Sequence, residues 1–513
     1  MQQTRRLRLL PLAATAAVLF AVSGCAGFIR PVPEHSSTVA AEAPAAAAAR
    51  ALAADDLAGA EAILQKALAE HPETPKVADP KMTELWTTAA RLRIRQQLYP
   101  EAERDVLKAL GTAQAVGPVA ELTSQRAVHY RVAEAYEDAG RDDDAVTHLR
   151  TARDLCLADP TLSESDACES ERNALVRVFM ATGRYPDAEP LVLGRIADVQ
   201  AHNGSYDLRL ADTLSDAASF YSRQGQYELS APLYARSFDI WKNFHDDAIA
   251  EQRKAVETGQ QSPYGPEFLR IRARHAPFIA PVGLDDQPPV LYKLGKPEEA
   301  ASVISFERRL WEADETAGPQ AMNDLNAAVA GGRDGADLVL DQEAVAYVYF
   351  KRSDYPHAEE YYRQALGGLQ SLWPSLTVSQ RRRLLREYLD ILGSLVVIDR
   401  SLEHYGEAVD YGRKQVELAE ALLDARDALR LDTLSALATS YREARDIPKA
   451  HEYSVRYMNA VAAARGNDHP DYAWALRNLG YVYLLEGAVD RSQSLENEAR
   501  SIWARHPIAA PEF

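Results

Sequence analysis

The residues of this chain that could carry covalent or metal chemistry are few. Its 12 histidines are scattered, and the sequence contains no zinc-protease motif, no nucleophile-elbow sequence and no Walker-type phosphate loop. Three consecutive acidic residues, Asp142–Asp144, could suggest a cation site. At a helix start, however, carboxylates cap free amides and favour the helix dipole, and this interpretation is preferred. The sequence therefore predicts no catalytic residue, no metal ion and no cofactor.

The first of three cysteines follows a segment with the layout of a secretory signal. Three arginines precede an apolar run over residues 9–22, which is too short to be trusted as a membrane span. The segment ends in Val-Ser-Gly-Cys25, which resembles the bacterial lipobox. This resemblance implies that Cys25 is lipidated and begins the mature chain, and Ala26 after it implies the outer membrane. The alternatives are an ordinary signal peptide with a coincidental cysteine and a retained anchor.

The other two cysteines, Cys156 and Cys168, form an even pair in a chain predicted to enter an oxidising compartment. Asp159-Pro160 breaks the helix between them. We expect a disulfide that closes a loop of about a dozen residues and contributes about 2–3 kcal/mol. The alternative is two unpaired buried thiols, and a zinc site is less favoured because two cysteines do not complete a zinc shell.

A small residue recurs along the chain at intervals close to 42 residues. We call it the marker, and the ten markers, which number the repeats, are Ala60, Ala102, Ala145, Ala188, Ser230, Ala300, Ala358, Ala408, Ala450 and Ser492. An aromatic residue stands nine positions before the marker in six repeats, at Tyr136, Phe179, Tyr221, Tyr349, Tyr441 and Tyr483. A fixed period of this kind predicts stacked helical repeats, with the recurrent aromatics packed in the core.

The last two repeats carry a family resemblance. Each of them has the same order of features: a large residue, Leu-Ala or Leu-Gly, a tyrosine, a turn, a small residue and an aromatic residue. This pattern resembles the tetratricopeptide repeat (TPR), and the 42-residue period with His469-Pro470-Asp471 resembles the longer variant of kinesin light chains. The resemblance implies an all-α, right-handed α-solenoid of about ten helix-turn-helix repeats, the sixth of them degenerate.

Helix-breaking proline and glycine residues, together with local changes in composition, divide the chain into six segments. We expect a signal peptide over 1–24, a flexible Pro/Ala-rich tether over 25–48 and an N-terminal TPR array over 49–258. These are followed by a Pro-rich insertion or hinge over 259–289, a C-terminal TPR array over 290–503 and a disordered tail over 504–513. The insertion could be a hinge between two half-arrays, a loop folded into a groove, or simple length variation.

In TPR proteins the first helices of the repeats line a concave groove that holds peptides. The resemblance implies that the groove-facing residues here are Tyr130, Glu134, Asn173, Arg177, Ser215, Ser219, Tyr347, Arg442, Arg477 and Tyr481. The alternative for each of them is an ordinary exposed helix residue. A basic patch, Arg381–Arg383 with Arg386, could serve a partner or a lipid headgroup, but a solvated face is the preferred interpretation.

Two classes of function remain open. The leading hypothesis is a non-catalytic lipoprotein scaffold at the bacterial envelope, facing the periplasm, that binds peptide segments or envelope proteins in assembly, secretion or polysaccharide export. The alternative is an enzyme or enzyme subunit acting on cell-wall or glycan substrates, with a site within 259–335. A formal charge of -18, or -21 without the three signal arginines, argues against nucleic acid as a partner. The oligomeric state stays open.

Overall fold

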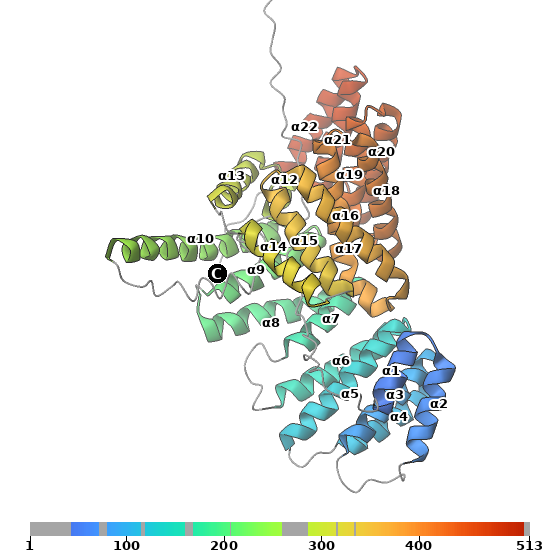
Figure 1. Ribbon diagram of the computed structural model, residues 1–513. Helices are drawn as coiled ribbons and strands as arrows, with labels where there is room; N and C mark the ends of the chain where they lie inside the picture. The colour runs from blue at the N-terminus through green and yellow to red at the C-terminus, as the bar shows by residue number, and fades with distance from the viewer. Residues whose placement is uncertain are drawn as a thin grey trace, which may run out of the picture. The chain divides into compact units, whose positions relative to one another are not determined.

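The computed structural model describes residues 43–70, 79–113, 118–159, 168–205, 207–258, 286–313, 317–332 and 335–506. All regular elements in these ranges are helices (Figure 1). The chain is an all-α solenoid of TPR-like helix pairs, as predicted. Within the same ranges, no helix is both long and apolar enough to cross a membrane. The predicted signal peptide, Cys25 and most of the predicted tether lie outside the described residues.

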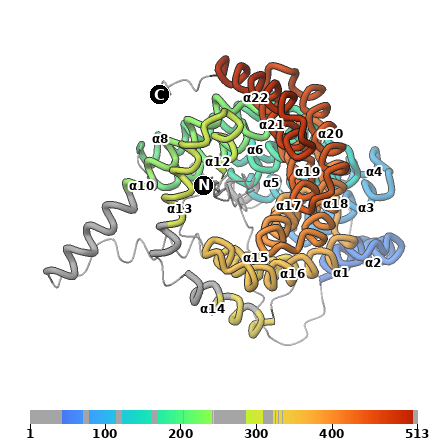
Figure 2. Tube along the Cα trace, turned by 90° about the horizontal axis from the view of Figure 1, so that it is seen from above, coloured from blue at the N-terminus to red at the C-terminus, as the bar shows by residue number. Residues whose placement is uncertain are grey.

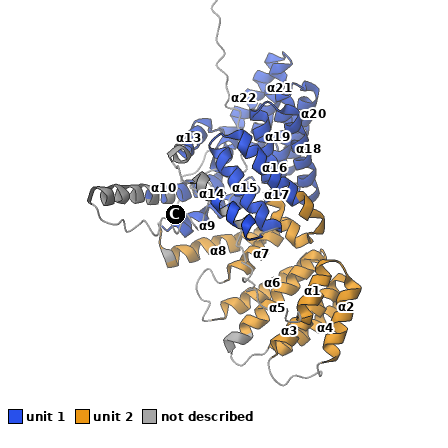
Figure 3. Ribbon diagram, viewed as in Figure 1, with its two compact units in different colours: residues 1–24, 206–369, 387–513 blue, residues 25–205, 370–386 orange. Residues whose placement is uncertain are grey.

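The chain forms two compact units, which Figure 3 colours separately. Unit 2 contains residues 25–205 and 370–386. It is built from α1 (Pro44–Ala53), α2 (Leu57–Ala69), α3 (Pro80–Arg95), α4 (Tyr99–Ala113), α5 (Pro118–Asp138), α6 (Asp142–Leu157), α7 (Glu169–Ala181), α8 (Tyr185–Asn203), the short 3-10 helix η1 (Trp373–Ser375) and the first residues of α17 (Val378–Ser401). Consecutive helices pack as pairs, and α3 also packs against α1 and α5.

Among the described residues, unit 1 contains those of 206–369 and 387–513. Its helices are α9 (Leu208–Arg223), α10 (Tyr227–Thr258), α12 (Gln287–Lys293), α13 (Pro297–Ala313), α14 (Ala317–Ala330), α15 (Gly335–Lys351), α16 (Tyr355–Leu372), the remainder of α17, α18 (Tyr405–Leu422), α19 (Ala428–Glu443), α20 (Ile447–Arg465), α21 (Pro470–Leu485) and α22 (Val489–Trp503). Helices α18 to α22 follow one another along one side of this unit (Figure 2).

The marker is the point of closest packing in almost every repeat. Nine of the ten markers are fully buried at 0% exposure, so a larger side chain there would have no space. The exception is Ser492 in the last repeat, which is half-buried. Its neighbour across the helix pair is Gly480, where an added Cβ would stand 3.5 Å from the Ser492 carbonyl oxygen.

A left-handed residue precedes every marker by five positions. It is glycine in five repeats, as at Gly140, and a residue with a side chain in the other five, at Asp55, Gln97, Ser353, Glu403 and Arg445. The next residue donates its backbone N–H to the carbonyl five positions earlier, as in Asp446 to Tyr441 at 3.0 Å. This 6→1 bond satisfies a free carbonyl at the helix end. The same turn therefore joins the two helices of all ten repeats.

A buried charged cluster holds the fifth and sixth repeats of unit 1 to the ninth and tenth. The Lys293 ammonium, 3% exposed, forms an ion pair with Asp432 and one of 2.9 Å with Asp471. Tyr227 donates to Asp471 at 2.6 Å, and Arg465 lies 2.8 Å from its other oxygen. Burial opposes the charged ammonium, but the two carboxylates outweigh it and hold the pKa of Lys293 above its usual range.

Further bonds surround this charged cluster. The Trp503 indole N–H donates to the Lys293 carbonyl at 2.6 Å, which fastens the last helix to α12. Arg465 also donates to backbone carbonyls of the α9–α10 turn. In that turn Gly225 has φ +75°, and an added Cβ would stand 2.5 Å from the Arg465 guanidinium. Glycine is therefore required at this position, because the backbone is left-handed and a side chain would collide with Arg465.

The observed division differs from the predicted arrays over 49–258 and 290–503. The charged cluster places the fifth repeat, α9 and α10, in unit 1 with the C-terminal repeats, so the boundary lies near residue 205. The first helix begins at Pro44, inside the predicted tether, and α12 begins at Gln287, inside the predicted insertion. Residues 259–285 and 507–513 lie outside the described residues. Helix α14 was not predicted.

We expect Arg445→Gly to raise the apparent free energy of unfolding by about 0.5–1 kcal/mol, because relief of the left-handed backbone exceeds the extra entropy of glycine. Arg445 is exposed. The matched control is Gly140→Ala, where a Cβ would meet nothing within 4 Å and only the backbone conformation is penalised. Urea denaturation should move the two variants in opposite directions. An unchanged or lower midpoint for Arg445→Gly would contradict the assignment.

Candidate partner-binding surface

Four acidic side chains of unit 2, of which Glu134 is a predicted groove residue, hold a basic segment of the same chain. Glu134, Glu137 and Asp138 lie in the last turns of α5, and Asp142 begins α6. The segment that they hold, residues 377–386, contains the start of α17. Both partners belong to unit 2. We call these four carboxylates the acidic site.

Each contact of the acidic site is charge-assisted. Arg382 bonds both oxygens of Asp142, at 2.6 and 3.2 Å, and its guanidinium also lies 3.4 Å from Glu137. Arg383 forms an ion pair with Glu134. Asp138 accepts the backbone N–H of Ser379 at 2.8 Å, in the first turn of α17 where such groups have no intrahelical partner. The site thus recognises two arginines and a helix N-terminus together.

These contacts change the interpretation of the basic patch. A solvated face was preferred for Arg381–Arg383, but all three guanidinium groups have partners, with Arg381 donating to the carbonyls of Trp373 and Pro374 at 3.1 Å each. The acidic run 142–144 begins α6, as predicted. Its members pair with Arg382, Arg184 and Arg141 respectively.

Two other predicted groove residues of unit 2 lie near the acidic site. Arg177 donates to Glu137 at 3.0 Å, so its guanidinium is already engaged. Tyr130 is half-buried next to the charges of Glu134 and Arg383, and burial raises the pKa of its phenol. Asn173 is half-buried as well. Of the four predicted residues in this unit, Glu134 thus contacts the basic segment directly and Arg177 contacts the acidic site that holds it.

Two predicted groove residues of unit 1, Ser215 and Tyr347, are buried and do not face a groove. Ser215 is 0% exposed, because α9 packs against both α10 and α19. Tyr347 is 5% exposed and belongs to an apolar cluster with Leu325 of the unpredicted helix α14. Neither side chain can contact a partner. Ser219 is half-buried on α9.

The C-terminal repeats keep three predicted residues at the surface. Tyr481 is 48% exposed, and the Arg442 guanidinium lies over its ring at 5.3 Å. No hydrogen bond or ion pair to the Arg442 guanidinium occurs among the described residues, and burial lowers the pKa of this group. Arg477, in contrast, donates to both oxygens of Glu496 at 3.0 and 2.9 Å. The Arg442 guanidinium therefore stacks on Tyr481 but has no carboxylate partner, and an acidic group of another molecule could bind it.

A cavity of about 410 Å³ lies between α2, α3 and α4 of unit 2. Leu64, Leu68 and Trp86 contribute apolar surface, and Lys108 lies 4.0 Å above the Trp86 ring. This volume is at the lower end of the range of ligand pockets, about 300–1,000 Å³. Sequence reasoning missed the cavity, because its lining is divided between two repeats and has no motif.

The structure joins Cys156 at the end of α6 to Cys168 just before α7 by a disulfide, with a Cα–Cα distance of 5.8 Å. Both cysteines are buried. The bond closes the connection that contains Asp159-Pro160. It links the third and fourth repeats at the end of α6 opposite to Asp142 of the acidic site.

Sequence analysis also did not predict the buried carboxyl group of Glu343 on α15. It is 3% exposed, and its Oε1 has no hydrogen-bond partner among the described residues. Burial, followed by repulsion from Glu387 and Asp390 on α17, raises its pKa well above the usual value. Glu343 therefore favours its protonated form more than an exposed glutamate does, and it occupies the core of unit 1 rather than a surface that could bind a partner.

No family model matches the chain, and no curated protein matches it. Among solved structures, the chain is similar to TPR-like repeats of a Podosopora anserina kinesin light chain, at 18% identity over 42% of this chain and 99% of that chain, with a TM-score of 0.35. It is also similar to apo RapI (11% identity, 83% and 98% covered, TM-score 0.33) and to the apo quorum sensor NprR from B. thuringiensis (12%, 90% and 97%, TM-score 0.30). Similarity at this level carries no inference about function.

We expect Glu343→Gln to stabilise the protein at pH 8 and to have little effect at pH 4. Because the pKa of Glu343 is raised in the folded state, the folded protein keeps this proton at pH values above 4.5, where the unfolded chain loses it. The free energy of unfolding of the wild type therefore falls as the pH rises above 4.5, by up to about 1.4 kcal/mol per pH unit. Glutamine cannot ionise and removes this loss. Thermal melts from pH 4 to pH 8 measure it, with the exposed Glu360→Gln as control. A stability difference independent of pH would contradict the account.

Proposed function

We propose that this protein is a non-catalytic scaffold that binds segments of partner proteins on its TPR-like repeats and is held at the bacterial envelope by lipid on Cys25. The observation that carries the binding function is the acidic site of unit 2. There, Glu134, which the repeat resemblance implies to face a groove, and the neighbouring Asp138 and Asp142 hold the side chains and the N-terminus of a helical segment of the same chain.

The chemistry of the acidic site suits peptide recognition. Carboxylates that accept two bonds from one guanidinium give both energy and orientation. The Asp138 carboxylate lies at the positive end of the α17 dipole, where an anion is stabilised by about 0.3–1 kcal/mol. Glu137 is 1% exposed, so its charge is weakly screened by solvent. The site therefore selects helical segments with adjacent basic residues near their start.

The surface of the last two repeats supports a second mode of binding. Arg442 and Tyr481 offer a cation and an aromatic face, and Leu484 and Leu485 beside them on α21 are 51% and 44% exposed. Arginine and tyrosine are the residue types that dominate binding energy at interfaces. A partner segment with an acidic and an apolar side chain fits this surface, which we call the Arg442–Tyr481 surface.

The envelope location rests on the resemblance of residues 22–25 to a lipobox. Several acyl chains on one residue would hold the protein stably, since each buried methylene contributes about 0.8 kcal/mol. Residues 26–43 separate Cys25 from the first helix, a length of chain sufficient to keep the repeats clear of the membrane surface. The partners in this proposal are envelope proteins or their exposed segments.

The test combines labelling with a clickable fatty acid, membrane fractionation and crosslinking capture, on wild type, Cys25→Ala and the pair Arg442→Ala with Tyr481→Ala. We expect the label and the outer-membrane location to be lost in Cys25→Ala. Capture of specific envelope proteins should fall several-fold when the Arg442–Tyr481 surface is removed, and it should persist in the control Arg500→Ala, an exposed arginine on α22. Absence of label overturns the anchor, and capture that is absent or equal in all variants overturns the scaffold.

A further inference from the structure

The eighth repeat departs from the register at one buried position. Asp399 stands nine residues before the marker Ala408, where six other repeats carry an aromatic residue. Asp399 is 0% exposed, and both of its carboxylate oxygens are buried without a hydrogen-bond partner in the described part of the chain. An isolated carboxylate at a fully buried position is costly unless a cation or a proton compensates it.

The third repeat shows the usual arrangement at this position, nine residues before the marker. Tyr136 donates its hydroxyl proton to Glu103, the residue that follows the marker of the preceding repeat. In the eighth repeat the same geometry brings Asp399 to Glu359, which follows the marker Ala358. A donor facing an acceptor has thus been replaced by two acceptors facing one another.

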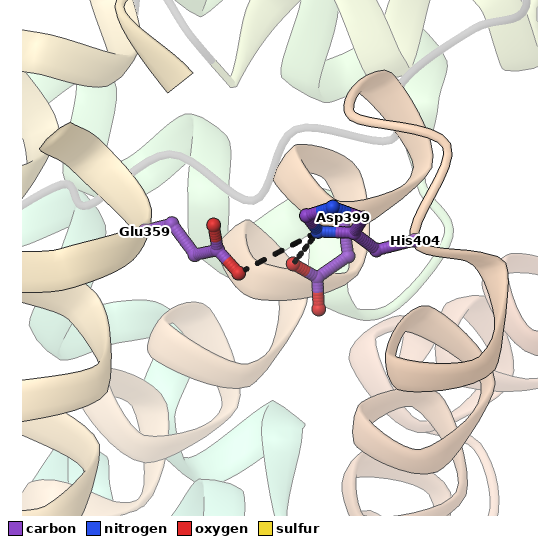
Figure 4. A group of neighbouring side chains, drawn as sticks. All are labelled: Glu359, Asp399 and His404. Atoms are coloured by element: carbon purple, nitrogen blue, oxygen red, sulfur yellow. Dashed lines mark ion pairs between the residues drawn. The ribbon is translucent and has the colours of Figure 1, made fainter. Parts of the chain in front are cut away.

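A histidine completes the cluster. His404 follows the left-handed turn residue of the eighth repeat, and its backbone N–H donates to the Asp399 carbonyl at 2.7 Å. Its Nδ1 lies 3.8 Å from Glu359 Oε1 and 4.0 Å from Asp399 Oδ1 (Figure 4). One ligand atom from each of the three residues lies within 4.8 Å of the others. The imidazole makes no capping bond to α18 and is half exposed, so it is free to turn.

The charges of the cluster do not balance. Arg363 lies 2.5 Å from Glu359 Oε1 but 4.0 Å from Asp399 Oδ1, so one guanidinium serves two carboxylates. The Arg363 side chain is 46% exposed and can be drawn outward. Burial and the neighbouring Glu359 raise the pKa of Asp399 to about 7. The missing positive charge can be supplied either by a shared proton or by a metal ion.

We propose that Glu359, Asp399 and His404 form a binding site for a divalent transition-metal ion of the zinc class, between the seventh and eighth repeats. One imidazole nitrogen and two carboxylate oxygens are zinc ligands, and a hard cation such as Mg²⁺ would not favour the imidazole. Zinc bonds of 2.0–2.1 Å place tetrahedral ligands about 3.3 Å apart. The observed 3.8 and 4.0 Å are longer, so binding would require His404 to rotate and Arg363 to move away from Glu359 Oε1.

The fourth position would face the solvent beside His404. Water or a side chain of a bound partner could occupy it. The ion would join α16, the end of α17 and the start of α18, which are consecutive parts of unit 1. Its role would be to fix the spacing of two repeats whose interval, 50 residues between markers, exceeds the usual 42.

The experiment is calorimetric titration of ZnCl₂ into the chelator-stripped full chain, with thermal melts of each variant. We expect one Zn²⁺ to bind the wild type with a rise in the melting temperature. Asp399→Asn and His404→Ala should bind at least tenfold more weakly. Asp399→Tyr, which restores the residue type of the other repeats, should fold and also lose the ion. The control is His357→Ala, an exposed histidine 2.8 Å from a single carboxylate of Asp354.

Three results would overturn the proposal. The first is a wild type that binds no Zn²⁺, in which case a shared proton satisfies the two carboxylates. The second is equal binding by wild type and the folded Asp399→Asn and Asp399→Tyr variants. The third is loss of binding in His148→Ala alone, which would assign the ion to the His129–His148 pair of unit 2, whose Nδ1 atoms lie 2.8 Å apart.

Discussion

A single buried ammonium group determines how unit 1 is assembled. Lys293 reaches Asp432 and Asp471, which lie 139 and 178 residues further along the chain. A buried charge without its partners costs about 3–5 kcal/mol, so α12 is stable only where α19 and α21 supply both carboxylates. Tyr227 and Arg465 then complete the bonding of Asp471. The repeats of this unit are thus held to distant repeats as well as to their neighbours, unlike those of an open array.

The local features of the fold could be predicted from the sequence because they arise within one repeat. A marker must be small where two helices cross, and the turn before it needs a left-handed residue, which glycine adopts freely at positions such as Gly140 and Gly183. These two requirements recur with a fixed period and are visible in a linear sequence. They identified every helix pair that carries a marker, including the degenerate sixth repeat, whose first helix α12 has only seven residues.

The assembly of the repeats could not be predicted, because it depends on pairs of residues with no common pattern. Arg382 and Arg383 have the sequence of a solvated basic face, and only the folded chain brings them to Asp142 and Glu134. Ser215 occupies a predicted groove position, yet α9 is covered within unit 1. Asp399 is the opposite case. Its departure from the aromatic register was visible in the sequence, but its carboxylate neighbours become apparent only when adjacent repeats are superimposed.

The measurement that tests the central role of Lys293 most directly is amide hydrogen exchange on Lys293→Met, compared with wild type and with Lys296→Met. Lys296 is a more exposed lysine just before α13, and it pairs with Glu299 three residues further on. We expect exchange to accelerate together in α9, α10, α12, α19 and α21, because the buried Asp432 loses its ion-pair partner and Asp471 keeps only Arg465. Helices α1–α6 of unit 2 and the Lys296→Met variant should be unchanged. Faster exchange confined to α12 would contradict the account.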